Sequence, residues 1–444
     1  VEDIVHENGY DMEKAGRMME MIEEKNEDRQ SFDQDAVMVY IDPHLMQGLA
    51  DVAAQKAANF QELLSAAQEG DLESAYQVAL SYANGRGTSK DSELAFQWFQ
   101  RAADGDHIAA QYQLGVCFLR GIGTEADIPR GLELITSTAD QDYLPSVCEL
   151  GLCYEMGTGV EESKERAAEL YRQAAQQGDA RAQCNLGFFY YRGIGVEESD
   201  SEAVYWFSQA AEQEYPRAQF LLGECYDLGF GVEADMAHAV ELYTKAHDGG
   251  YPPATCSLGL CYELGKGVEE DKERAARLYL QAAEEEDPRA QCNLGFFYYW
   301  GIGVEKDLAH AVLWFSRSAE QQYPRAQYLL GHCYEFGYGV EKSLEKAAAL
   351  YQAAHHRSYS DGTCALGLCY ELGTGVEQDK AKAVELYRQA AQQGNARAQC
   401  NLGFCYYQGI GVETDDKTAV EWFQKAADQE YPRAMMLLGE CYEN

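Results

Sequence analysis

Ten Gly-x-Gly pairs recur along this chain at a constant spacing of 36 residues. They begin at Gly85, Gly121, Gly157, Gly193, Gly229, Gly265, Gly301, Gly337, Gly373 and Gly409. A fixed period of this length, kept without insertion over most of a chain, is the signature of a solenoid whose repeats stack on their neighbours. We therefore expect one elongated array of small repeats rather than several globular domains.

Each repeat contains two helical patterns, one on each side of the glycine pair. Ala182, Leu186 and Tyr190 lie four residues apart and form one apolar stripe of a first helix. The glycines that follow can adopt the left-handed conformation that ends a helix. Ser199 and Glu202 then predict a capping box at the start of a second helix.

Glycine and proline mark two further positions of the repeat. Gly187 lies within the apolar stripe of the first helix, where a missing side chain would let a neighbouring helix approach closely. Prolines stand where the first helix of a repeat should begin, at Pro216, Pro252, Pro288, Pro324 and Pro432. Strand signals are weak outside Ala36–Ile41. The sequence therefore predicts an all-α fold, a right-handed α-α superhelical solenoid of about ten 36-residue helix-turn-helix repeats.

The chain is predicted to have two domains. Residues 1–58 form an acidic N-terminal helical extension or cap, and residues 59–444 form the solenoid. Asp11–Lys25 has the pattern of an amphipathic helix, Pro43–Asn59 is also predicted to be helical, and Phe60–Ala67 is similar to the second helix of a repeat. In an alternative interpretation, residues 1–42 are the end of another domain.

The repeated residues resemble those of a known family. Ala182, Leu186-Gly187, Tyr190, Gly193-Ile194-Gly195-Val196, Ala203, Trp206-Phe207 and Ala210-Ala211 are similar to the Sel-one-like repeat, a relative of the tetratricopeptide repeat with a longer internal loop. The resemblance extends from about Asp71 to Asn444, and the first repeat departs from it with Val78-Ala79 in place of Leu-Gly. It implies an adaptor that binds other proteins rather than an enzyme.

A longer period of 108 residues is superimposed on the first. Trp98, Trp206, Trp314 and Trp422 each begin a Trp-Phe pair, and Cys184-Asn185-Leu186-Gly187-Phe188 recurs at Cys292 and Cys400. Duplication of blocks of three repeats explains this period. The alternative is a ligand surface that recurs in every third repeat.

The net charge of the chain limits the classes of partner that we expect it to bind. The net charge is -39, with 74 acidic and 35 basic residues, and nucleic-acid binding requires clustered Lys and Arg. We therefore expect no nucleic-acid partner. A basic protein segment would be attracted by this field, although the same charge also serves to keep a long surface soluble. No apolar run approaches the about 20 residues of a membrane helix, so no membrane insertion is expected.

The 14 cysteines do not predict disulfides within repeats. Pairs such as Cys148 and Cys153 are five residues apart on one helix, about 7.5 Å along the axis, which is beyond disulfide reach. Cysteine-rich members of the resembled family carry a pair across the junction between repeats, where this chain has alanines. A reducing, cytoplasmic location is favoured, while a secreted or periplasmic one stays open because the precursor N-terminus is not seen. No spacing predicts a metal or cofactor site.

Enzyme signals are sparse. Ser343-Leu344-Glu345-Lys346 matches the Ser-x-x-Lys of penicillin-recognising enzymes, but Ser343 occupies the capping position that Ser163 and Ser199 hold in other repeats. A hydrolase using Ser343 and Lys346 remains as an alternative function. The chain is otherwise predicted not to be an enzyme.

Candidate binding residues follow from the tetratricopeptide-like arrangement that the resemblance implies, in which the first helix of each repeat lines a concave groove. They are Arg181, Asn185, Phe188 and Tyr191, then Arg289, Asn293, Phe296 and Tyr299, then Arg397, Asn401, Phe404 and Tyr407, with Glu224, Asp227, His332 and Glu335 from intervening repeats. Asparagine can hold a peptide backbone, aromatic rings supply rigid contact area, and carboxylates suit a cationic side chain. The predicted function is a scaffold or adaptor that binds a segment of another protein. Two alternatives are that these residues serve the core of the array, or that the array is a purely structural spacer.

Overall fold

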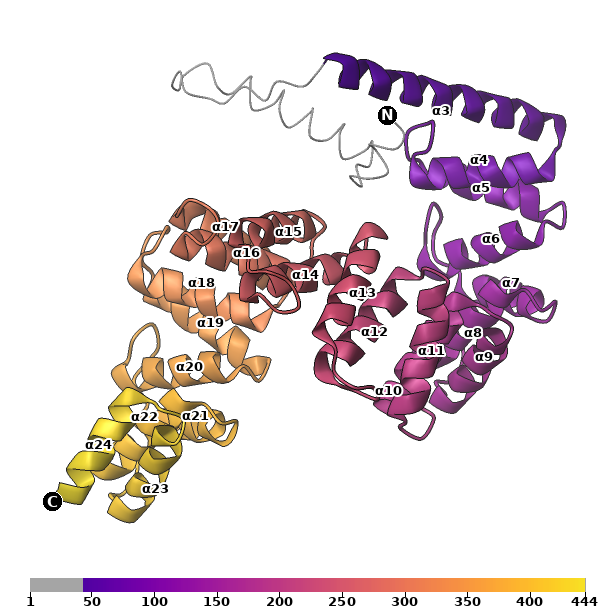
Figure 1. Ribbon diagram of the computed structural model, residues 1–444. Helices are drawn as coiled ribbons and strands as arrows, with labels where there is room; N and C mark the ends of the chain where they lie inside the picture. Colours follow the sequence, from indigo (N-terminus) through magenta and orange to yellow (C-terminus); the bar gives the residue numbers. More distant parts are fainter. Residues whose placement is uncertain (1–42, 444) are drawn as a thin grey trace. The chain divides into compact units, whose positions relative to one another are not determined.

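The computed structural model describes residues 43–443, and those residues form 22 helices and no strand (Figure 1). The helices alternate between the two kinds that the repeat predicts, and we call the first helix of each repeat the A helix and the second the B helix. The predicted helix Asp11–Lys25 and the alternating stretch Ala36–Ile41 lie outside the described residues. Within these limits the chain is an all-α solenoid of helical hairpins, as predicted.

The helix boundaries repeat with the period of the sequence. The A helices are α4 (Leu72–Asn84), α6 (Ile108–Arg120), α8 (Leu144–Met156), α10 (Ala180–Arg192), α12 (Pro216–Leu228), α14 (Pro252–Leu264), α16 (Pro288–Trp300), α18 (Pro324–Phe336), α20 (Ser360–Leu372), α22 (Ala396–Gln408) and α24 (Pro432–Glu443). The B helices are α5 (Ser92–Ala103), α7 (Ile128–Ala139), α9 (Lys164–Gln176), α11 (Asp200–Glu212), α13 (Met236–Asp248), α15 (Lys272–Glu284), α17 (Leu308–Glu320), α19 (Leu344–His356), α21 (Lys380–Gln392) and α23 (Asp416–Ala427). A longer helix, α3 (Pro43–Glu69), precedes them and continues without a break across the predicted domain boundary after residue 58.

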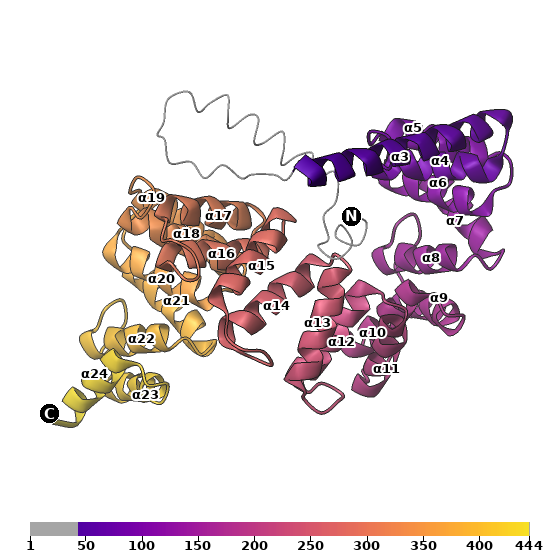
Figure 2. The ribbon, with the colours of Figure 1, turned by 45° about the horizontal axis from the view of Figure 1, so that its top comes forward.

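The described chain divides into two compact halves. One half holds α3 to α12 with Asp248–Gly250, and the other holds Met236–His247 of α13 together with α14 to α24. In each half, A and B helices alternate and pack on their neighbours along the chain, as α10 does on α9 and α11 (Figure 2).

The turn between the A and B helices depends on glycine. Gly193 ends α10 with φ 61°, in the left-handed region, and its N–H donates to the carbonyl of Phe189. Gly195 also has positive φ, 63°, and a Cβ at this position would lie 2.4 Å from the Lys164 backbone of the preceding B helix. The second glycine is therefore required both for the turn and for the contact between repeats.

The start of the B helix is capped in part as predicted. Ser199 Oγ accepts a hydrogen bond from the Glu202 N–H at 3.3 Å. The reciprocal half of the predicted capping box does not form, because the Ser199 N–H donates to the Tyr190 carbonyl at 3.0 Å, while the Glu202 carboxylate accepts from the Trp206 indole at 3.2 Å. The predicted first-turn prolines are confirmed, since Pro216, Pro252, Pro288, Pro324 and Pro432 each begin an A helix.

The core continues from one hairpin into the next, since a single cluster joins buried residues of α8, α9 and α10. Ala182 and Leu186 of the predicted stripe are fully buried, and Tyr190 packs on the edge of the same cluster. A Cβ at Gly187 would lie 2.7 Å from the Phe207 ring of α11. The close approach predicted at this glycine is therefore confirmed, and Gly295 and Gly403 meet Phe315 and Phe423 in the same way.

Candidate interaction surface on the A helices

All sixteen predicted binding residues lie on A helices of the described chain. Helices α10, α16 and α22 each carry four of them, and α12 and α18 each carry two. Fifteen are half-buried, while Asn401 is 8% exposed. Half-burial allows a side chain both to pack within the array and to contact a ligand.

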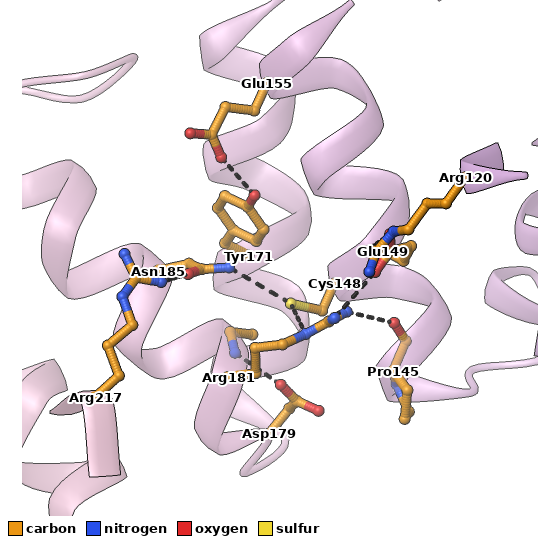
Figure 3. A network of polar contacts seen from close by, with 11 residues as sticks. Arg120, Pro145, Cys148, Glu149, Glu155, Tyr171, Asp179, Arg181, Asn185 and Arg217 are labelled. Atoms are coloured by element: carbon orange, nitrogen blue, oxygen red, sulfur yellow. Dashed lines mark hydrogen bonds and ion pairs between the residues drawn. The ribbon is translucent and has the colours of Figure 1, made fainter. Parts of the chain in front are cut away.

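The predicted asparagines join three consecutive A helices. Asn185 Nδ2 donates to the Cys148 thiol on α8 at 3.8 Å, and Asn185 Oδ1 accepts from Arg217 on α12 at 2.9 Å (Figure 3). The same arrangement recurs in the other two blocks, where Asn293 lies between Cys256 and Arg325 and Asn401 lies between Cys364 and Arg433. We call this recurring set the Cys-Asn-Arg ladder.

The predicted phenylalanines belong to the same ladder. The guanidinium of Arg217 lies over the Phe188 ring at 5.7 Å from its centroid. Arg325 lies over Phe296 at 5.4 Å and Arg433 over Phe404 at 5.2 Å. Each arginine thus connects the asparagine and the phenylalanine of the preceding A helix, by a hydrogen bond and a cation–π contact.

Arg181 makes further contacts with α8, and of the other two predicted arginines only Arg289 repeats one of them, the bond to the carbonyl of the equivalent proline, Pro253. Its guanidinium donates to the Cys148 thiol at 3.2 Å and to the Pro145 carbonyl at 3.1 Å, and it pairs with Glu149 at 2.9 Å. Arg120 of α6 reaches the other oxygen of Glu149 at 2.7 Å (Figure 3). Glu149 is only 2% exposed, so two arginines neutralise a buried carboxylate.

Burial disfavours the thiolate form of the cysteines in the ladder. Burial raises the pKa of Cys148 to about 12, and that of Cys256 and Cys364 to about 12 as well. The thiolate is the reactive form, so these cysteines remain protonated and act as small apolar residues with weak polarity. None of the 14 cysteines, all of which lie within the described residues, forms a disulfide.

The predicted acidic residues are engaged within the array. Glu335 accepts a hydrogen bond from the hydroxyl of Tyr351 on α19 at 2.5 Å. Burial, and then this bond to the carboxylate, raises the pKa of Tyr351 above its ordinary value. The same pairing joins Tyr171 to Glu155, Tyr279 to Glu263 and Tyr387 to Glu371. Glu224 and Asp227 are half-buried on α12 and also interact with other residues.

Six aromatic side chains gather on α16, α18 and the turn after α18, and we call them the aromatic surface: Phe296, Tyr299, Trp300, His332, Phe336 and Tyr338. Helices α16 and α18 lie side by side in the views of Figures 1 and 2. Phe336 and Tyr338 stack at 5.7 Å between centroids, His332 lies 4.7 Å from Phe336, and Tyr299 lies 5.1 Å from Trp300 and 6.0 Å from Tyr338. This surface brings together three predicted residues, Phe296, Tyr299 and His332, with three that were not predicted.

The three missed residues are among the most exposed rings of the described chain. Trp300 is 58% exposed, Phe336 50% and Tyr338 39%. Trp300 and Phe336 are the last helical residues before a Gly-x-Gly pair, and the same position holds exposed Met156, Leu228, Leu264 and Leu372 in other repeats. A large apolar residue recurring immediately before the glycines was the signal that could have identified this exposed row.

The residues of the alternative hydrolase have other partners. Ser343 Oγ accepts from the Lys346 N–H at 3.3 Å and so caps α19, while the Lys346 ammonium lies 5.0 Å from the centroid of the Tyr334 ring. Residues 43–443 contain no group of three or more His, Cys, Asp or Glu side chains placed to hold a metal ion. In the same part of the chain, no helix combines the length and the apolar character needed to cross a bilayer.

Comparisons with known proteins agree with the helical repeat. The Sel1 repeat family model matches residues 72–107, 108–143, 145–179, 180–215, 216–251, 252–287, 288–323, 324–354, 360–395, 396–431 and 432–444. Among solved structures, the chain is similar to c5321, a protective antigen of uropathogenic Escherichia coli strains that displays an SLR fold. Identity is 32% over 86% of this chain and 82% of that chain, with a TM-score of 0.57.

A second solved structure is a Sel1 repeat protein from Oxalobacter formigenes. It is 29% identical over 55% of this chain and 96% of its own length, with a TM-score of 0.50. No curated protein matches the chain.

Proposed function

Because this chain belongs to the Sel1 repeat family, we propose that it is a non-enzymatic scaffold that binds a segment of another protein along its A helices. Repeat solenoids of this type generally serve as protein-interaction scaffolds, since stacked repeats create an extended surface. In this proposal the A helices form the concave wall predicted from the sequence, and the partner segment runs across successive repeats.

The observation that carries the proposal is the aromatic surface of α16 and α18. Exposed Trp300, Phe336 and Tyr338 lie together, and exposed Leu264 and Leu372 occupy the equivalent position on the A helices before and after. Contiguous exposed apolar residues on a soluble protein mark interaction sites, and Trp and Tyr dominate the energetics of such contacts.

The chemistry of this surface defines the partner. A row of exposed apolar side chains, one on each of α14, α16, α18 and α20, suits a segment that presents bulky apolar side chains of its own. The net charge of -39 would accelerate the encounter with a segment whose flanks are basic. The partner we propose is therefore an apolar protein segment with basic flanks.

The asparagines of the Cys-Asn-Arg ladder can form further hydrogen bonds with a peptide backbone. An asparagine amide has two donor hydrogens and two acceptor lone pairs, and Asn185 uses one donor on Cys148 and one acceptor on Arg217. Because both bonds also fix the direction of the amide group, the remaining donor and acceptor are held in place for a ligand. The asparagines in this proposal act both in the array and on the partner.

Affinity capture with mass spectrometry tests the proposal through a matched pair of variants. The test variant replaces Trp300, Phe336 and Tyr338 with alanine. The control variant replaces Leu313 and Tyr205 with alanine, because these side chains are also exposed, 45% and 52%, but lie on B helices. Helical content and thermal unfolding are measured for both variants, so that a folding defect is recognised.

The expected result is a protein that is recovered with the wild-type array and with the B-helix control but lost with the aromatic variant. Equal recovery by both variants would contradict the proposed surface. Background recovery with every form would favour a purely structural spacer. Alanine at Asn185, Asn293 and Asn401 together should also abolish recovery, and here the folding measurement is essential because all three residues join A helices.

A further inference from the structure

The blocks of three repeats provide an internal comparison for the buried carboxylate of the N-terminal half. Moving along the chain by two blocks, twice 108 residues, relates Arg120, Glu149 and Arg181 to Phe336, Ala365 and Arg397. In the first set, Glu149 lies between the two arginines at 2.7 and 2.9 Å. In the second set, only the last arginine is kept, and alanine replaces the glutamate.

Arg397 has therefore lost the carboxylate that its counterpart binds. It is half-buried at the start of α22, with Cys364, Tyr328 and Tyr431 as electrostatic neighbours. Within residues 43–443, its guanidinium forms no ion pair and no hydrogen bond with another side chain or carbonyl. Arginine is always charged and offers five donors, so this group presents an unused cation at the surface of the A helices.

The carboxylate that α20 contributes near this position is already bound. Asp361 stands where Pro145 stands in the first block, and its carboxylate accepts from Asn395 Nδ2 at 2.8 Å. Tyr359 also donates a side-chain hydrogen bond to Asp361, and its pKa is raised by burial first and by this acid next. Asp361 thus has two partners that do not include Arg397.

In the middle block of three repeats, the equivalent arginine has other partners. There Ser257 replaces the glutamate, and the equivalent arginine, Arg289, donates to the Pro253 carbonyl at 3.1 Å and lies 3.9 Å from Asp287. The charge of Arg289 is therefore paired within the chain. Of the three equivalent arginines, Arg397 alone has no such contact within the described residues.

We propose that Arg397 is an open carboxylate-binding site that takes a glutamate or aspartate side chain of a partner protein. Glu149 shows that an acidic side chain fits beside the equivalent arginine, and guanidinium groups bind carboxylates with two parallel hydrogen bonds. The inference rests on the proposed scaffold function and adds one specific contact to it.

The proposed contact at Arg397 differs in its surroundings from the ion pair between Arg181 and Glu149. Phe336, which is 50% exposed, stands at the position of the second arginine, so no second guanidinium is available to the incoming carboxylate and an exposed ring takes that position. The partner therefore carries an apolar side chain next to its acid. Acidic and basic residues nearly balance between positions 288 and 395, so the acidic excess of the chain is not concentrated at this site.

The first test supplies the proposed site with a carboxylate from the chain itself. Ala365→Glu places a carboxylate at the position of Glu149, and Ala365→Gln is the uncharged control of the same size. We expect A365E to unfold at a higher temperature than A365Q, because the new carboxylate pairs with Arg397. An A365E midpoint equal to or below that of A365Q would overturn the proposal.

The second test uses the unmodified chain with acetate as the probe, at constant ionic strength against chloride. The side-chain Nε–H resonance of Arg397, assigned by its loss in Arg397→Ala, should shift saturably with acetate and should not respond in A365E. Glu149→Ala should create a second acetate-responsive arginine in the N-terminal half. A response equal to that of chloride, or one that persists in A365E, would contradict a carboxylate site.

Two further probes separate the sources of the carboxylate. N-acetylglutamate amide carries a side-chain carboxylate, while N-acetylalanine carries only a chain-terminal one. Stronger binding of the glutamate probe is expected, and a preference for N-acetylalanine would overturn the side-chain assignment. These titrations do not depend on capture of a partner, so failure of the scaffold proposal and failure of this site give different results.

Discussion

Asn185 and Arg217 lie 32 residues apart in the chain, and a hydrogen bond of 2.9 Å joins their side chains. The bond links α10 to α12, two A helices of consecutive repeats, without passing through the B helix between them. It also holds Arg217 over the Phe188 ring. A residue predicted to contact a ligand is thus also part of the connection between repeats.

Alanine at Asn185 should lower the stability of the N-terminal half. A hydrogen bond to a charged group contributes about 1.5–3 kcal/mol, and partial exposure places the expected loss near the lower end. The loss of unfolding free energy is measured by urea unfolding, which is monitored by circular dichroism. Asn84→Ala is the control with little expected effect, because Asn84 is exposed and donates only to Leu80 within its own helix. A double-mutant cycle with Arg217→Ala should show coupling, and purely additive effects would contradict the ladder.

Alanine at Gly187 should disturb the contact between α10 and α11. The added Cβ would lie 2.7 Å from the Phe207 ring and 3.1 Å from the Ala203 carbonyl, and overpacking of a core costs about 1–3 kcal/mol. Gly439→Ala is the matched control, since nothing lies within 4 Å of a Cβ at that helical position. Thermal unfolding should show a lower midpoint for G187A and no loss for G439A. Equal midpoints would show that the glycine is not needed for close packing.

Ser343→Ala should affect stability in the same way as Ser163→Ala. Both serines accept a hydrogen bond from the N–H three residues later, at 3.3 and 3.2 Å, and loss of such a cap costs about 1 kcal/mol. Urea unfolding of the two variants should therefore give similar shifts. A labelled β-lactam should not acylate the protein. A covalent adduct that disappears in S343A would instead support the hydrolase.

Stability should fall in alkaline solution because folding keeps thiols and phenols protonated. Burial raises the pKa of Cys184 from 9.0 to about 12, and it raises the pKa of Tyr171 as well, with the bond to Glu155 adding to the effect. A folded pKa above the unfolded one means that the stabilisation is complete below pH 9 and is lost as pH rises beyond it. Each such group contributes a slope of about 1.4 kcal/mol per pH unit.

Urea midpoints measured from pH 8 to pH 11 under reducing conditions test this expectation. Cys184→Ala should flatten the decline, because it removes one group that must remain protonated in the folded state. Tyr205→Phe is the control, since Tyr205 is 52% exposed. A midpoint that does not change with pH would show that these groups are not buried in solution.

The repeat, its helices and its turns could be predicted because they depend on residues close together in the chain. Pro216 and Gly193 mark helix ends through backbone geometry alone. The capping box at Ser199 was predicted only in part, since Glu202 binds Trp206 rather than closing the box. The Ser199 N–H donates to the Tyr190 carbonyl, and the spacing of Ser199 and Glu202 alone does not predict that contact.

The candidate surface was predicted less completely because it depends on contacts across repeats. The role of Asn185 between Cys148 and Arg217 requires knowledge of which faces of α8, α10 and α12 meet. Trp300 and Phe336 were missed because helical periodicity finds the buried stripe, whereas these residues stand outside it at the helix end. The binding role of the A-helix residues remains a prediction.

The Cys-Asn-Arg ladder recurs at every third repeat, and this constrains how the gene for such a chain can lengthen or shorten. Loss of a single repeat would place a side chain of another kind opposite each asparagine at the junction. Loss or gain of three repeats would restore the same neighbours on both sides. We therefore expect this protein to tolerate changes of length in steps of 108 residues, the spacing at which the ladder recurs.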